Sequence, residues 1–136
     1  MNDTAAKILI IGGLASLLFS FVVAFSLALA RMADPEADRH LHLQVHVVSL
    51  WEGFMLLGLV WAVALSDLSS GLETTAALLL VAGGALQLIS NTMGWRQNIT
   101  NLFAPPRGLA FQLARVNAIL AMAGLVILSI GALKGL

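Results

Sequence analysis

The fold of this chain is decided by an uncharged apolar run near its beginning, ILIIGGLASLLFSFVVAFSLALA, residues 8–30. A helix needs about 20 apolar residues to cross the hydrocarbon core of a bilayer, so these 23 residues are long enough to span it. The run ends in a sequence that resembles a signal-peptidase site. The apolar region of a cleaved signal peptide is usually only about 7–15 residues, however, which favours a retained transmembrane helix.

The composition extends this interpretation to the whole chain. Of its 136 residues, 60% are hydrophobic and only 10% are charged, whereas soluble globular proteins carry about 25% charged residues. The length suits a single domain, residues 1–136. Seven basic and seven acidic residues leave no basic surface that would attract nucleic acid. The absence of cysteine excludes disulfides, thiolate metal ligands and cysteine nucleophiles.

Three further apolar runs follow the first, and polar stretches separate them. Together they predict four transmembrane helices, at about residues 8–30, 43–65, 74–95 and 109–133. The stretches 31–39 and 96–108 contain all three prolines and are expected to be loops, and 66–73 is expected to be a short turn. The predicted fold is therefore an all-α integral membrane protein, a four-transmembrane-helix bundle.

Small and polar residues recur at helical spacing within these spans. Stripes of small residues allow another helix to approach closely; they occur at Gly12, Ser16, Ser20 and Ala24, and at Asn117, Gly124 and Gly131. A polar stripe inside a membrane span is expected to face protein or a cavity rather than lipid; it is formed by Gly84, Gln87, Asn91 and Trp95.

The basic residues predict an orientation. Five arginines lie on the side of the two long loops, and two lysines, Lys7 and Lys134, lie on the opposite side. Because basic residues accumulate on the cytoplasmic side, the long loops are expected in the cytoplasm and both termini on the other side. The bacterial inner membrane is the expected location.

The start of the second helix holds all three histidines, His40, His42 and His46, with Glu52 deeper in the span. A neutral imidazole is a good ligand for iron or zinc, and the alternative for His46 is a hydrogen bond to a neighbouring helix. His42 and His46 share a helical face. The six residues from His46 to Glu52 turn the helix by about 600°, which leaves Glu52 roughly 120° off that face and disfavours one shared metal site. We expect His40 and His42 to be solvated residues of the loop or residues of the membrane interface.

Glu52 is the most costly residue to bury, because a carboxylate inside a membrane must be paired or kept neutral. It is either a proton donor, proton acceptor or substrate contact, or it forms a structural pair with Arg115, Asn91 or Gln87. Trp95 ends the polar stripe of the third helix, where it either lines a pocket or belongs to the aromatic belt at the membrane interface.

The second helix contains His46, five residues, then Glu52-Gly53 and an apolar run that includes Gly58 and Trp61. This pattern resembles the styrene oxide isomerases and the related hydroxylaminobenzene mutases, small four-helix membrane enzymes whose second helix carries a histidine, five residues and Asn-Gly. In the epoxide isomerases, an Asn near the end of helix 3 is followed four residues later by Tyr, a spacing that Asn91 and Trp95 keep. Residues 105–111, PPRGLAF, resemble the family's Pro-Asn-Arg-Gly-Leu-Thr-Phe. The number and order of helices agree over the whole chain.

The resemblance implies a haem b (iron) held between adjacent subunits of a homotrimer, with His46 as the metal ligand. The ferric iron would act as a Lewis acid that converts a small aryl epoxide to its carbonyl isomer, without net redox change. We expect four further residues to bind the cofactor, Ser49, Gly53, Arg107 and Arg115. We expect three catalytic residues, Glu52, Asn91 and Trp95. In a trimer, the second helix would give one haem its ligand and the next haem a distal residue. The other expected partners are membrane lipid and a small hydrophobic substrate.

Two departures from the family concern the substrate. Glu52 stands where the family has Asn, which changes the polarity on the distal side of the haem. Trp95 stands where the family has Tyr, so a hydroxyl that could hold the epoxide is lost. The sequence leaves open a hydroxylaminobenzene mutase-type rearrangement and a non-catalytic b-type haem protein. A small proton-coupled transporter that uses Glu52 and a structural subunit without chemistry are the remaining alternatives.

Overall fold

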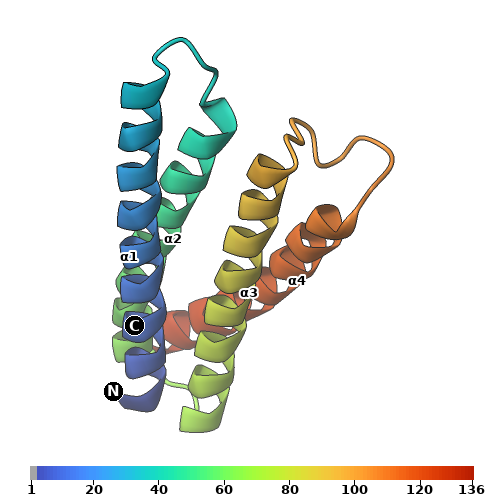
Figure 1. Cartoon of the computed structure of the whole chain (residues 1–136). Helices are drawn as coiled ribbons and strands as arrows, with labels where there is room; N and C mark the ends of the chain where they lie inside the picture. Colours follow the sequence, from blue (N-terminus) through green and yellow to red (C-terminus); the bar gives the residue numbers. More distant parts are fainter. Residues whose placement is uncertain (1–2) are drawn as a thin grey trace.

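A computed structural model describes residues 3–136 as four long helices joined by one short turn and two longer loops (Figure 1). The helices are α1 Asp3–Ala33, α2 His40–Leu65, α3 Ser70–Arg96 and α4 Leu109–Gly135. Each is long and apolar enough to cross a membrane. The four predicted spans are thus confirmed, and the architecture fits an integral membrane protein.

All four helices extend beyond the apolar runs from which they were predicted. Helix α2 begins at His40, so all three histidines are helical, and α1 continues to Ala33 into the polar stretch. Apolarity marks the part of a helix that lies in hydrocarbon, whereas helical hydrogen bonding continues into the polar ends.

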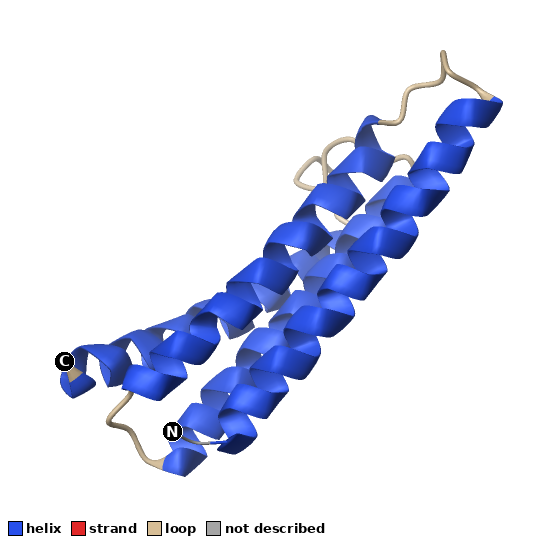
Figure 2. Ribbon diagram, turned by 90° about the vertical axis from the view of Figure 1, so that its left-hand side faces the viewer, coloured by secondary structure: helices blue, strands red, loops and turns tan. Residues whose placement is uncertain are grey.

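The helices form two antiparallel pairs. Helices α1 and α2 lie side by side, as do α3 and α4, and the second pair leads away from the first toward the end with the long loops (Figures 1 and 2). Helix α3 contacts α1 and α2, and α4 contacts α2 and α3. Within the described residues α1 and α4 do not pack against each other.

The apolar core lies at the end of the bundle that holds the chain termini. It is built from the first turns of α1 and α3 and the last turns of α2 and α4, with Leu9, Val63, Leu80 and Leu128 fully buried. The opposite end, toward the long loops, is where the helix pairs separate and where the polar side chains lie (Figure 1). The fold therefore keeps one end for packing and leaves the other open for a site.

Small residues set the distances between the helices. A Cβ atom at Gly12 would come within 2.6 Å of Val81 on α3, and one at Gly124 within 2.7 Å of Leu80. Such contacts are too short for any side chain, so the close-packing role predicted for these stripes is confirmed at both positions.

Large apolar side chains cover the outside of the spans. Among the most exposed are Ile11, Leu18, Phe21, Phe25, Trp51 and Trp61. An apolar surface of this extent is unfavourable in water and suits the hydrocarbon of a bilayer.

Candidate functional site

Helix α1 holds the ring of His46 through Ser20. The His46 Nδ1 atom lies 2.8 Å from the Ser20 hydroxyl oxygen and 3.1 Å from the Ser20 carbonyl oxygen. The Ser20 hydroxyl donates its only hydrogen to the His46 carbonyl, at 3.0 Å. Nδ1 therefore carries the proton and donates to Ser20. In this tautomer Nε2 keeps its lone pair, and no described residue bonds to it.

His42 is held in the opposite tautomer. Its Nε2 atom lies 2.8 Å from the Ser26 hydroxyl oxygen, and that hydroxyl donates to the Val23 carbonyl at 2.8 Å. Nε2 must therefore be the donor in the histidine–serine bond, which occupies the nitrogen that His46 leaves free.

The prediction that His42 is solvated is wrong, because its side chain is only 4% exposed. The imidazole stacks on the Trp95 ring with centroids 4.0 Å apart and planes inclined by 20°. On Trp95 in turn lies the Arg96 guanidinium, 5.4 Å from the ring centroid. His40 is exposed, as expected, and its backbone N–H donates to Asp38 at 2.9 Å. The stack joins the start of α2 to the end of α3.

Ser49 and Gly53, two predicted cofactor-binding residues, lie inside the contact between α1 and α2. The fully buried Ser49 hydroxyl donates to carbonyls of its own helix, at 2.8 Å from Val45 and 2.9 Å from His46. At Gly53, a Cβ atom would meet the Leu17 side chain at 2.6 Å. Gly53 thus brings α2 close to α1, and Ser49 lies one turn before it, next to His46.

Glu52 points to α3 of its own chain. A Cβ atom added at Gly84 would overlap its carboxyl group, and its Oε1 atom is buried without a hydrogen-bond partner. Within residues 3–136, Glu52 has none of the pairings considered from the sequence: Asn117 donates to Gln87 instead, and Arg115 is exposed. The interpretation of Glu52 as one half of a structural pair is therefore wrong for the described chain.

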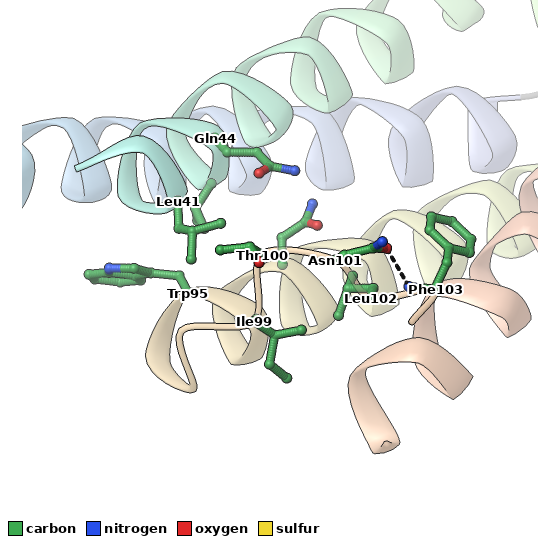
Figure 3. A pocket seen from close by; sticks show the side chains of 11 residues that line it. Leu41, Gln44, Trp95, Ile99, Thr100, Asn101, Leu102 and Phe103 are labelled. Carbon is green, nitrogen blue, oxygen red and sulfur yellow. Dashed lines mark hydrogen bonds between the residues drawn. The ribbon is translucent and has the colours of Figure 1, made fainter. Parts of the chain in front are cut away.

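Asn91 and Trp95, two predicted catalytic residues, line one cavity of about 140 Å³ between α2, the end of α3 and the following loop (Figure 3). Asn91 is 8% exposed, and its Nδ2 donor is buried without a partner. Gln44 reaches this cavity from α2, and the loop residues Thr100 and Asn101 close it (Figure 3). The structure thus brings together two of the three predicted catalytic residues.

Arg107 and Arg115, the other predicted cofactor-binding residues, line a separate, mostly apolar cavity of about 350 Å³ on α4. The Arg107 Nε atom donates to the Phe103 carbonyl at 3.2 Å, and its guanidinium lies 5.2 Å from the Phe111 ring centroid. Within one chain, neither arginine shares a described cavity with His46.

The sequence missed the serines that orient the histidines. Ser20 appeared in the stripe of small residues as a packing residue, and Ser26 lies outside that stripe. The only available signal was their type, because a serine in a span can bond a polar group on the next helix. Among residues 3–136 no three His, Asp or Glu side chains lie together in an arrangement that holds a metal ion.

Comparison of the chain with protein-family models, with curated proteins and with solved structures found no match in any of the three. An assignment of function therefore rests on the residues and on their geometry.

Proposed function

We propose that this protein is a membrane-bound haem b isomerase of the type that the sequence resembles. Its substrate is a small aryl epoxide, and its product is the isomeric carbonyl compound. The observation that carries the proposal is the tautomer of His46, whose Nδ1–H is donated to Ser20 while Nε2 is left free. A ligating histidine typically donates its other ring N–H to the protein in this way, which orients the ring and raises its basicity.

The donor set suits a haem better than a bare metal ion. A haem iron needs only one protein ligand, whereas zinc sites of proteins take three or four. His46 is half-buried, so part of the residue remains accessible from outside the chain. When bound there, ferric haem supplies a Lewis acid that polarises the epoxide oxygen.

The cavity of Asn91 and Trp95 offers what the substrate needs from the protein. The unpartnered Nδ2 of Asn91 is a buried donor that a substrate oxygen would satisfy. Trp95, fixed by the His42 stack, provides an aromatic wall. The buried, unpartnered Oε1 of Glu52 is free to take part in proton transfer deeper in the span.

A homotrimer accounts for the separation of these parts. His46 lies on the α2 face that packs on α1, whereas the Asn91–Trp95 cavity lies between α2 and α3. In a closed ring each subunit presents one surface to one neighbour and a different surface to the other. One neighbour would then supply the ligand and the other the substrate cavity, and native mass spectrometry of the purified protein is expected to show three chains.

An absorption spectrum and one assay test the proposal. We expect purified protein to show a Soret band, which His46→Ala loses and the control His40→Ala keeps. We also expect conversion of styrene oxide to phenylacetaldehyde by the His40→Ala variant but not by His46→Ala. A protein that takes up no haem on reconstitution would overturn the cofactor assignment.

The second substrate to be tried is an aryl hydroxylamine, because Gly58 and Trp61 resemble the mutases of the same family. Haem without turnover of either substrate would point to a non-catalytic b-type protein. A cytochrome with two histidine ligands is disfavoured by His42, whose Nε2 donates to Ser26.

A further inference from the structure

A third cavity lies between α1 and α3, on the apolar outside of the bundle. It has a volume of about 450 Å³, and its lining is almost wholly apolar. Gly12 and Val81, where the two helices approach closely, belong to its lining, as does Leu56 of α2. Toward the long loops α3 leads away from α1 (Figure 1), which opens the space. We call this cavity the α1–α3 groove.

One polar group in the groove lacks a partner. Ser16 is only 6% exposed and lines the groove, and its hydroxyl, which keeps some accessible surface, forms no hydrogen bond with any of residues 3–136. The other buried serines, Ser20, Ser49 and Ser90, all donate to a carbonyl. Thr92, across the groove, donates to the Leu88 carbonyl. The groove therefore presents one free hydroxyl donor in apolar surroundings, an unfavourable arrangement unless an acceptor completes it.

We propose that the α1–α3 groove binds a small, mainly hydrocarbon molecule that carries one hydrogen-bond-accepting oxygen and enters from the bilayer. A pure hydrocarbon leaves the Ser16 donor unsatisfied. A molecule with several polar groups would bury those groups without partners. Water alone does not suit the groove either, because a buried water needs two to four polar partners.

The depth of Ser16 in the span favours such a molecule over a phospholipid as the ligand of the groove. Ser16 lies 13 residues from the start of α1 and 17 from its end, which is about 20 Å and 26 Å along the helix axis. This position is in the middle of the span, where acyl chains have no oxygen. The ester oxygens of a phospholipid lie in the polar interface, outside the hydrocarbon.

The burial of Ser16 argues against an interface between two copies in the groove. A helix with its side chains is about 10–12 Å across. Ser16 is almost completely buried between its own helix, α1, and α3. A helix of a second copy that covered the groove would therefore leave the Ser16 hydroxyl without an acceptor.

The groove lies close to the histidine that carries the proposed function. Ser16 and Ser20 are one helical turn apart on α1, and Ser20 holds the His46 ring. An aryl epoxide is a hydrocarbon with one acceptor oxygen, so the proposed substrate belongs to the class that fits the groove. This link to catalysis rests on the proposed function, whereas binding in the groove does not.

Photolabelling tests the inference without haem or turnover. The protein in lipid nanodiscs is irradiated with benzophenone, an aryl ketone with one acceptor oxygen, and the labelled peptides are mapped by mass spectrometry. We expect label within residues 12–19 and 81–93, with half-maximal labelling at about tenfold higher concentration in Ser16→Ala, the loss of one hydrogen bond. Ala85→Leu, a change at an exposed lining residue, is expected to abolish that labelling.

Two matched variants serve as controls. Ser129→Ala removes an exposed hydroxyl on α4, and Ala82→Leu enlarges an exposed residue of α3 outside the groove. Both are expected to label like the unaltered protein. Equal labelling of all five proteins would overturn the inference. So would a co-purified phospholipid that Ala85→Leu removes, or a cross-link from the groove to a second chain. Because haem is not needed, labelling distinguishes failure of this inference from failure of the proposed function.

Discussion

Ser20 determines which nitrogen of His46 keeps a free lone pair, the nitrogen that would bind iron under the proposed function. Replacing it with Ala removes the hydroxyl that bridges the His46 ring and the His46 carbonyl. Loss of such an outer-shell partner typically lowers metal affinity by about 10–100-fold. We expect Ser20→Ala to lower haem affinity to that extent, as measured by titrating apoprotein with haem and following the Soret band. Ser26→Ala, which frees His42 instead, is the control, and an equal loss in both variants would contradict the assignment.

A substitution at Glu52 tests whether its carboxyl group has a chemical or a structural role. Because its carboxyl has no partner within the described residues, Glu52→Gln removes the ionisable group without breaking a bond. We expect the melting temperature in detergent to stay the same or to rise, since an ionisable group in a span is costly. Under the proposed function, the variant keeps its haem and loses turnover by at least about 100-fold, the usual contribution of an acid–base group. A variant that fails to fold would indicate a structural pair after all.

From the sequence alone, His46 and Glu52 could be selected as candidate site residues, and the angle between them around the helix axis could be estimated. The structure bears that angle out, because His46 faces α1 and Glu52 faces α3. The burial of His42 was not predictable, since it depends on Trp95, 53 residues later in the chain. The tautomers of His42 and His46 were not predictable either, because they depend on how two helices are rotated against each other.

At the scale of helices, the contact between α2 and α3 depends on Gly84. A methyl group there overlaps the Glu52 carboxyl, so we expect Gly84→Ala to lower the free energy of unfolding by about 1–3 kcal/mol. In Glu52→Ala the obstructing group is absent, and adding Gly84→Ala to that variant should cost much less. Denaturation of the four proteins in detergent measures this coupling.

Gly58→Ala is the matched control for Gly84→Ala. It lies on the exposed side of α2, and nothing comes within 4 Å of a Cβ atom built there. Because alanine is the better helix former, this variant should gain about 0.5–1 kcal/mol. Additive effects of Gly84→Ala and Glu52→Ala would show that the two residues do not touch.

The four spans were predictable because each one must present about 20 apolar residues to lipid. Their arrangement in two diverging pairs was not, because all faces of a membrane helix are apolar and periodicity cannot identify the buried one. Only the stripes of small and polar residues carried that information. Gly12 and Gly124 indeed lie at the crossings, and Gly84 and Asn91 of the polar stripe are buried.

For the whole molecule, the open prediction is its orientation in the membrane. The chain has no cysteine, so single cysteines can be introduced and labelled without background. We expect Glu36→Cys and Asn101→Cys, both in exposed long loops, to react with a membrane-impermeant maleimide only from the cytoplasmic side. Ser69→Cys, in the exposed turn between α2 and α3, should react only from the other side. The reverse pattern would contradict the arginine count.

The pairing of α1 with α2 has a consequence for how the protein is made. These two helices are synthesised first, and the bond between Ser20 and His46 lies entirely within them. The contact of Gly13 with Gly53 likewise needs nothing from the second half of the chain. The hairpin of α1 and α2 can therefore form, with the His46 ring already oriented, before the residues of the Asn91–Trp95 cavity have been translated.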